Sequence, residues 1–455
     1  MRDMTIGKPS KQIISFTLPI LWSFVLQQVY NMADAVVAGR FIGSRVLAAV
    51  GISGLLMNFL LAIIMGLATG TSILVSQLFG AKQEENLRRT VSTSLIFALV
   101  LVAVISGTGY AFTPGLLRLL DVPGDIIGDA ATYLRIILMG MVFSMCASMF
   151  GANLTALGET KKPFYIMLAC NTVNLGLDLL FVLAFGWGVA AIAATTVAAQ
   201  ALGAALGYIY IVKRVPILKI TKLIFDRKIL RSILKYSIPT ALQTSIQSFG
   251  GLVIIRLVNG FGGFVVAGYT AAMKVDQFAV MPVTSMSAGI TTFAAQNMGA
   301  GLEDHAKRGL RFGLFAMVAV ALVLTVIIRV AGAGTVSLFI DSADGRTQIL
   351  AAGTQYITIN SGFYVLFAAL VAFNGFFRGA GDALIVMIMT LSSLALRAGF
   401  AYALVYIGGL GIEAVAWSNP IGWGICGLFC VFYFMRGMWR GKMEIKTETP
   451  AEAQE

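Results

Sequence analysis

Long apolar stretches, separated by short polar segments, recur along almost the whole chain. Twelve of them are long enough to cross a bilayer as helices of about 20 residues. They lie near residues 14–38, 48–78, 91–112, 131–154, 164–186, 189–212, 234–257, 265–293, 311–334, 354–377, 384–406 and 412–435. The pattern therefore predicts an all-α membrane protein with twelve transmembrane helices.

The second half of the sequence repeats the first with a shift of about 220 residues. Phe16-Thr-Leu-Pro19 corresponds to Tyr236-Ser-Ile-Pro239, and Gly158-Glu159 corresponds to Gly381-Asp382. Each half holds six predicted spans, and an even number gives both halves the same orientation in the membrane. We therefore predict two six-helix lobes related by pseudo-two-fold symmetry, at residues 1–212 and 236–440, with a basic connector at 213–235 and a disordered tail at 441–455.

Composition supports the membrane assignment, and the position of the basic residues explains the charge. The chain is 58% hydrophobic and 12% charged, with a mean hydropathy of +0.86. Its net charge of +12 would suit nucleic acid, but the lysines and arginines gather at alternate ends of the spans and in the connector. This bias predicts that both termini and the connector are cytoplasmic, and it argues against a nucleic-acid partner.

The sequence offers little for enzymatic or metal chemistry. Its four cysteines lie inside predicted spans, and His305 is the only histidine, so we expect no transition-metal site. Gly379-Ala-Gly-Asp382 has the G-x-G-D pattern of intramembrane aspartyl proteases, but a Tyr-Asp partner motif is lacking. There is also no P-loop. We expect neither an enzyme nor a cofactor.

Polar side chains form stripes inside the spans of the first half, each on one helix face. They are Gln27, Tyr30, Asn31 and Asp34 in the first span, Asn171, Asn174 and Asp178 in the fifth, and Thr195, Thr196 and Gln200 in the sixth. A carboxylate at the bilayer centre costs at least ~2.5 kcal/mol, so the two acids should face an internal cavity. They form either a cation or proton site, or satisfied hydrogen bonds between helices.

The second half lacks these acids. Ile254 and Ala401 occupy the positions that correspond to Asp34 and Asp178. The polar residues that remain in the seventh and tenth spans are neutral: Thr240, Gln243, Thr244, Gln247, Asn360 and Tyr364. For the acid of the eighth span, Asp276, we favour a structural ion pair with Arg256. Coupling to an ion is therefore expected in the first half.

Two prolines occupy equivalent positions in the repeat. Pro19 and Pro239 fall in the first turns of spans one and seven. A proline removes one backbone donor and loosens a helix. Each is either a tolerated transmembrane proline or a hinge that lets its span bend.

Together these features resemble the multidrug and toxic compound extrusion (MATE) family over almost the whole chain. Pro19 followed by Asp34, with Gln27 between them, looks like the family's first span. Asn174-x3-Asp178 followed by Thr196 is similar to the cation-site residues of its DinF-like branch. The NorM-like branch has a glutamate in span seven where this chain has Gln247. The resemblance implies an antiporter of the bacterial cytoplasmic membrane that exports organic cations in exchange for protons or sodium.

The resemblance also implies roles for individual residues. The coupling residues would be Asp34, Asp178, Asn174, Thr196 and Tyr133, and a sodium ion could bind at the first four. The substrate cavity would be lined by Gln27, Tyr30, Asn31, Asn171, Gln200, Gln243, Gln247, Asn360 and Tyr364. We expect a monomer that acts on small organic cations.

A lipid-linked oligosaccharide flippase of the same superfamily is the alternative. Such flippases tend to line their cavity with basic residues, because arginine and lysine pair with pyrophosphate. Here Arg135 and Arg397 are the main candidate cavity cations, whereas the stripes of the first half carry aspartates. Site chemistry therefore favours the antiporter, although the fold alone does not decide.

Overall fold

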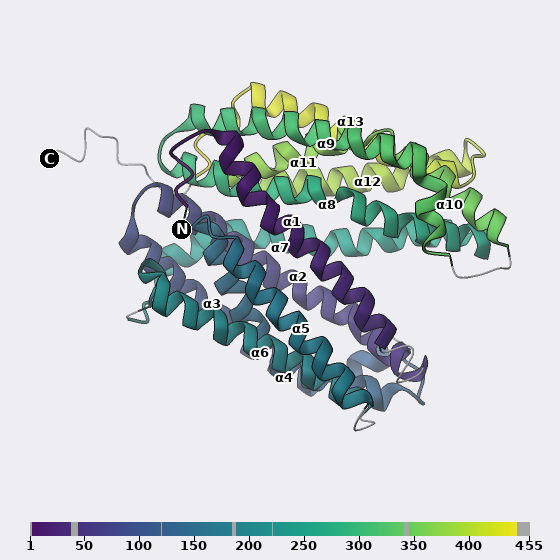
Figure 1. The fold of residues 1–455 in the computed structure, drawn as a ribbon, viewed down its shortest axis with the longest axis horizontal. Coiled ribbons are helices and arrows are strands. Elements are labelled where there is room, and N and C mark those ends of the chain that lie inside the picture. The colour runs from purple at the N-terminus through teal and green to yellow at the C-terminus, as the bar shows by residue number, and fades with distance from the viewer. Residues whose placement is uncertain are drawn as a thin grey trace. The chain divides into compact units, whose positions relative to one another are not determined.

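The structure is a computed structural model that describes residues 2–37, 44–119, 121–183, 188–220, 222–340 and 345–443. Within these ranges the regular secondary structure is helical, without strands, as the apolar pattern predicts (Figure 1). The predicted disordered tail lies outside the described residues from residue 444 onward.

The chain divides into two compact units. Unit 1 comprises Trp22–Ala241 and a short N-terminal segment that ends at Asp3. Unit 2 comprises Met4–Leu21 and the chain from Leu242 onward. The lobe limits expected from the repeat, at residues 212 and 236, stay a prediction.

Two helices contribute residues to both units. Helix α1 (Pro9–Val37) is divided just after Pro19, and α7 (Arg227–Asn259) is divided just after Pro239. Both prolines lie inside their helices, where each removes a backbone donor. Equivalent positions of the sequence repeat therefore mark both divisions.

Unit 1 is completed by the remaining helices of the first half. They are α2 (Ser44–Gly80), α3 (Glu84–Leu119), α4 (Ile127–Ala156), α5 (Lys161–Leu183) and α6 (Val189–Arg214), followed by a 3-10 turn (Pro216–Leu218). Helix α4 is central, because it packs against α2, α3 and α6 (Figure 1). The predicted connector ends inside α7, which begins at Arg227.

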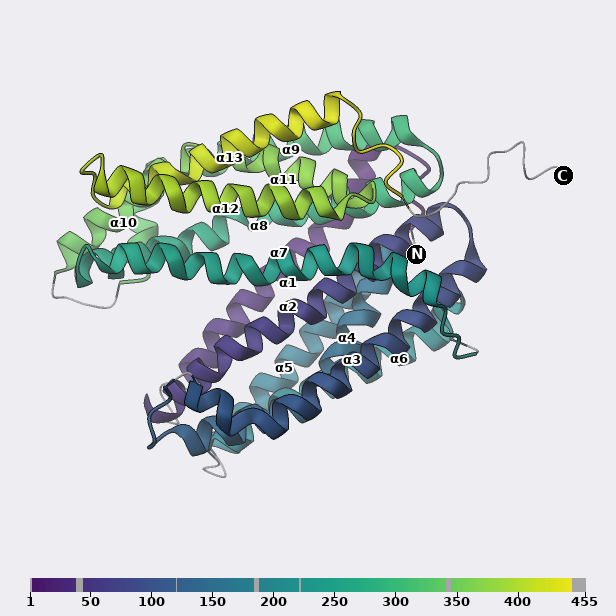
Figure 2. The same ribbon diagram turned by 180° about the vertical axis from the view of Figure 1, so that it is seen from behind.

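Unit 2 is completed by the helices that follow α7. They are α8 (Gly263–Gly299), α9 (Glu303–Ser337), α10 (Arg346–Ser361), α11 (Tyr364–Gly379), α12 (Ala383–Tyr406) and α13 (Ile412–Met435). Helix α8 packs against α9, α10 and α11, and α12 packs against α13 (Figure 2).

The tenth predicted span differs from expectation. Eleven helices in the described chain are long and apolar enough to cross a membrane, and the pair α10 and α11, bent by 54°, can form a twelfth crossing. A span is predicted at residues 354–377, and the structure divides this stretch between two helices. Helix α10 already begins at Arg346, and the helix breaks at Gly362 and Phe363. A Ser-Gly pair such as Ser361-Gly362 is a frequent cause of such a break.

The repeat is visible in the helix contacts of each unit. In unit 1, Gly70 of α2 lies directly against Ser237 of α7. In unit 2, the equivalent Gly289 of α8 lies against the equivalent Thr17 of α1. A Cβ atom at either glycine would overlap its neighbour. Small residues let helix backbones approach closely in membranes, so the same close approach is built in both units.

The Gly158-Glu159 and Gly381-Asp382 pairs of the repeat form equivalent turns. Both glycines have positive φ, +79° and +91°, a conformation that side chains with a Cβ rarely adopt. The acid that follows each glycine accepts a hydrogen bond from a backbone N–H in the first turn of the next helix, α5 or α12. Asp382 also accepts a hydrogen bond from Tyr433 at 2.6 Å. The G-x-G-D pattern is thus a helix cap.

We expect Gly70→Leu and Gly289→Leu each to destabilise the protein by roughly 1–3 kcal/mol, because the new side chain overlaps a neighbouring helix. Gly107→Leu and Gly251→Leu are matched controls, since a Cβ at either position meets open space. Unfolding of the purified variants in mixed SDS and detergent micelles measures the effect. Equal stability of the Gly70 and Gly107 variants would contradict the close contact.

Candidate functional site

A buried polar cluster forms in unit 1 where α1, α5 and α6 meet. Asn174 and Asp178 of α5 are 2% and 1% exposed, so both are shielded from their surroundings. Tyr30 of α1 donates a hydrogen bond to Asn174 Oδ1, and Thr195 of α6 donates one to Asp178 Oδ1. Residues from three helices are therefore joined through two side chains of α5. We call this group, with Asp34 and Tyr133, the acid cluster.

The two predicted acids share this cluster. Asp34 of α1 is half-buried, and its carboxylate interacts electrostatically with Asp178. The hydroxyl groups of Tyr30 and of Tyr133, which α4 supplies, interact with both carboxylates. The structure thus brings together four of the five residues predicted for coupling: Asp34, Asp178, Asn174 and Tyr133. Neighbouring like charges oppose joint ionisation, so a pair of interacting acids favours binding of a proton or another cation.

Several polar atoms of α5 have no hydrogen-bond partner within the described part of the chain. They are the second carboxylate oxygen of Asp178, Oδ2, and the amide nitrogens of Asn171 and Asn174. A buried polar atom without a partner costs about 1–3 kcal/mol. Carboxylate, amide and hydroxyl oxygens are ligands that a hard cation such as sodium accepts. Of these three atoms only Asp178 Oδ2 is an acceptor that could bind a cation, since the two amide nitrogens are donors.

The threonine that contacts Asp178 differs from the one expected. Thr195 makes this contact, whereas the hydroxyl of Thr196 bonds to the backbone oxygen of Ile192 at 2.8 Å. Adjacent residues of an α-helix point about 100° apart, so only one of them can face α5. The family spacing selected Thr196, and a shift of one residue along α6 turns it away from the carboxylate.

The other polar residues predicted for the first half make local contacts. Gln200 accepts a hydrogen bond from Ser144 of α4. Gln27 donates to Asn31 at 3.1 Å, one turn along α1, and Asn31 donates to Gln28 at 3.3 Å. Their role in lining a substrate cavity stays a prediction.

The polar residues predicted for the second half separate into different environments. Gln243 is buried and held on both sides, because it donates to Thr390 and accepts from Arg378, each at 3.0 Å. Gln247, four residues further along α7, is exposed. Asn360 and Tyr364 are buried and belong to a separate cluster in unit 2.

This second cluster centres on Asp276 of α8. Its Oδ1 atom accepts hydrogen bonds from Asn360 at 2.9 Å and from Tyr364 at 2.5 Å. Asn419 of α13 in turn donates to Asn360 at 2.8 Å. The ion pair expected between Arg256 and Asp276 is wrong, because Arg256 is exposed and the neutral donors take its place.

The Asp276 cluster holds the break between α10 and α11. Asn360 lies in the last turn of α10 and Tyr364 is the first residue of α11, so one carboxylate binds both sides of the break. Its negative charge also suits the N-terminal end of α11. On α9, Thr325 donates to the backbone oxygen of Ser361 at 2.6 Å. The sequence signal for this arrangement was an acid in one span and a Ser-Gly pair in another.

We expect Tyr364→Phe to destabilise unit 2 by about 1.5 kcal/mol, because it removes a hydrogen bond to a charged group at the break. Tyr406→Phe is the matched control, since Tyr406 is 76% exposed. Unfolding in SDS micelles compares the two variants. Equal stability of the Tyr364→Phe and Tyr406→Phe variants, together with unchanged stability of Asp276→Asn, would show that the Asp276 cluster does not hold the helix break.

Comparison with known proteins places this arrangement in a family. The MatE family profile matches residues 19–180 and 239–403, one match in each half of the repeat. The chain is similar to "Probable multidrug resistance protein YoeA" of Bacillus subtilis, with 28% identity over 448 residues that cover 96% of both chains.

Solved structures agree with the fold. "Crystal structure of MATE in the bent conformation" matches with a TM-score of 0.89 and 23% identity over 97% of this chain and 98% of the other. A MOP superfamily transporter from Pyrococcus furiosus, with "reverse polarity of binding pocket" in its description, matches with a TM-score of 0.87 and 22% identity over 97% and 98%. With a family match in both halves, this chain belongs to the MATE family: it is a multi-pass membrane transporter and not an enzyme.

Proposed function

We propose that this protein is a secondary active antiporter that exports organic cations in exchange for protons or sodium ions. The observation that carries the proposal is the acid cluster, in which Asp34 and Asp178 share one site among otherwise apolar spans. Ionisable residues inside membrane spans typically mark the path of an ion or a substrate. The name of the Bacillus subtilis relative, a probable multidrug resistance protein, supports drugs as the exported class.

The chemistry of the cluster suits exchange. Asp178 Oδ1 is engaged by Thr195, while Oδ2 is free to bind a proton, a sodium ion or an organic cation. Two neighbouring carboxylates can hold any one of these, but mutual repulsion of the cations prevents them from holding all together. Binding of the coupling ion then displaces the substrate, and the reverse. This competition is the basis of antiport.

The membrane potential can supply the driving force. One positive charge that moves inward releases about 2.3 kcal/mol per 100 mV. That energy supports roughly a 50-fold concentration gradient of a neutral substrate. For a monovalent organic cation, exchange for one ion moves no net charge, so the concentration gradient of the coupling ion, or the entry of a second ion, supplies the energy.

The acid cluster would control access to the site by bending helix α1. Tyr30 and Asp34 lie beyond Pro19, on the part of α1 that belongs to unit 1. A charge change at Asp34 or Asp178 alters the hydrogen bond and the electrostatic interactions that hold Tyr30. The proline has already removed one backbone hydrogen bond, so α1 can bend there at low cost. Alternating access would follow from this bending.

Site chemistry disfavours a flippase for a pyrophosphate-linked lipid. The Cζ atom of Arg135 on α4 lies 5.2 Å from the centre of the Tyr110 ring. Arg397 lies beside Tyr269 and Asp276 in unit 2. Neither arginine takes part in the acid cluster. Carboxylates would repel a pyrophosphate, whereas they attract an organic cation.

We expect Asp34→Asn and Asp178→Asn each to reduce ion-driven export by at least about tenfold, because a neutral amide binds neither the coupling ion nor the cationic substrate well. The measurement is uptake of a fluorescent organic cation by proteoliposomes, with proton and sodium gradients imposed separately. Asp121→Asn is the control, since it removes an acid outside the described helices.

Two outcomes would contradict the antiport proposal. Export that persists in both the Asp34→Asn and Asp178→Asn variants would show that these residues are not the coupling site. Robust export by the wild-type protein with neither gradient imposed would show that export is not coupled to a proton or sodium gradient.

The two adjacent threonines of α6 allow a sharper test. Thr195→Val removes the hydrogen bond to Asp178, which is worth about tenfold in an equilibrium constant for a charged acceptor. Thr196→Val removes only a hydrogen bond to the backbone of its own helix. We expect Thr195→Val to shift the dependence of transport on proton or sodium concentration by about tenfold, and Thr196→Val to leave it nearly unchanged. The reverse order of effects would favour the family spacing over the contact with Asp178.

A further inference from the structure

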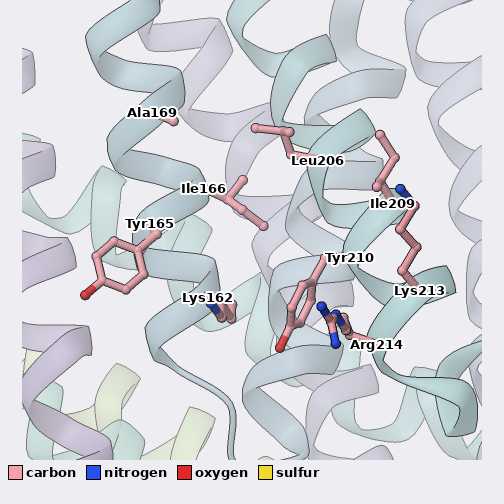
Figure 3. Close-up of a pocket in the computed structure, with 9 residues that line it drawn as sticks. All are labelled: Lys162, Tyr165, Ile166, Ala169, Leu206, Ile209, Tyr210, Lys213 and Arg214. Carbon is pink, nitrogen blue, oxygen red and sulfur yellow. The ribbon is translucent and has the colours of Figure 1, made fainter.

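An open groove of about 350 Å³ lies between α5 and α6 of unit 1, at the first turns of α5 and the last turns of α6 (Figure 3). Its residues recur three or four positions apart on both helices, so each helix turns one face to the groove. The lysine and arginine bias of the sequence predicts that these helix ends are cytoplasmic. The groove is separate from the acid cluster.

The rim of the groove is basic. Lys162 of α5 and Lys213 and Arg214 of α6 are all exposed, and none makes an ion pair within the described part of the chain. An acid, Glu159, also lies near, where its carboxylate accepts a hydrogen bond from the backbone N–H of Lys162 at 3.4 Å. Three positive groups against one negative group leave a net positive site.

The walls of the groove are apolar. Ile166 of α5 and Leu206 of α6 face each other across it (Figure 3). About one turn before Leu206 on α6, a Cβ at Gly203 would lie only 3.3 Å from the sulfur of Cys170 on α5. The two helices are therefore in close contact beyond Leu206, and the groove lies on the basic side of that contact.

Two tyrosines, Tyr165 of α5 and Tyr210 of α6, also line the groove, each about one helical turn from a basic residue. Tyr165 is 56% exposed, and the ring of Tyr210 lies 5.9 Å from Lys162 Nζ. Tyrosines concentrate at the level of lipid headgroups, because their rings are apolar and their hydroxyls are polar. From its basic end, each helix therefore contributes a cation, then a tyrosine and then apolar residues to the groove.

We propose that this groove binds an anionic glycerophospholipid. The headgroup phosphate would lie among Lys162, Lys213 and Arg214, and one acyl chain would lie along Ile166 and Leu206. Basic pockets between transmembrane helices on the cytoplasmic side suit anionic headgroups. An organic cation would be repelled by the rim, and a free phosphate ion would leave the apolar walls without a partner.

The bound lipid would brace two helices of the acid cluster. Helix α5 carries Asn174 and Asp178, and α6 carries Thr195. A lipid in the groove between their ends would contact both helices and so hold the pair together. The lipid site is independent of the antiport proposal, since it rests on other residues and is tested by binding.

The test is native mass spectrometry of the purified full-length protein, titrated with dioleoylphosphatidylglycerol and with dioleoylphosphatidylcholine. We expect tighter binding of phosphatidylglycerol. Each basic side chain contributes about fivefold in affinity, so the variant K162Q/K213Q/R214Q should lose about a hundredfold. The control K219Q/K222Q/R227Q removes the same charge from exposed residues outside the groove and should change affinity by less than about threefold.

A second variant tests the apolar wall without a change in charge. Ala169→Trp places a large ring in the groove and should weaken phosphatidylglycerol binding by about tenfold. Equal wild-type affinity for the two lipids would overturn the proposal, and so would an equal loss in the control variant. If the triple variant fails to fold, unchanged binding by Ala169→Trp overturns it instead.

Discussion

The exclusion of water from the bilayer core is the constraint on which the rest of this structure depends. Each polar group inside a span must find a partner within the protein. Most hydroxyls meet this need locally, as Thr172 does by bonding to Leu168 one turn earlier at 2.8 Å. Asp178 does not, because only one of its two oxygens is engaged. The cost of leaving the other oxygen free is the physical reason for proposing the acid cluster as a binding site.

The two halves share the same helix contacts but place their buried acids on different helices. Gly70 against Ser237 and Gly289 against Thr17 repeat the same helix contact. The carboxylates do not repeat. The first half holds its acids on α1 and α5, whereas the second half has Asp276 on α8, and the corresponding helix α2 contains no acid. Asp276 receives two donors on one oxygen and holds a helix break, so its role is structural.

The success of sequence reasoning depended on whether a feature is local. Helical spacing predicts that Tyr30 shares a face with Asp34 and Asn174 with Asp178, and the structure brings these four residues into the acid cluster. The choice between Thr195 and Thr196 failed, because a rotation of α6 by one residue decides which hydroxyl faces α5. The prediction of the partner of Asp276 was wrong for a similar reason. Charge suggested Arg256, but packing brought Asn360 and Tyr364 to the carboxylate.

The sequence by itself determined the membrane class, the repeat and the transmembrane spans, apart from the break in the tenth, and it located the two acids that the structure brings together. Hydrophobicity and helical period are properties of neighbouring residues, so they can be read along the chain. Only the tertiary structure decided the break between α10 and α11, the threonine that contacts Asp178, and the basic groove between α5 and α6. Each of these depends on the rotation and separation of helices, which packing sets between residues far apart in sequence.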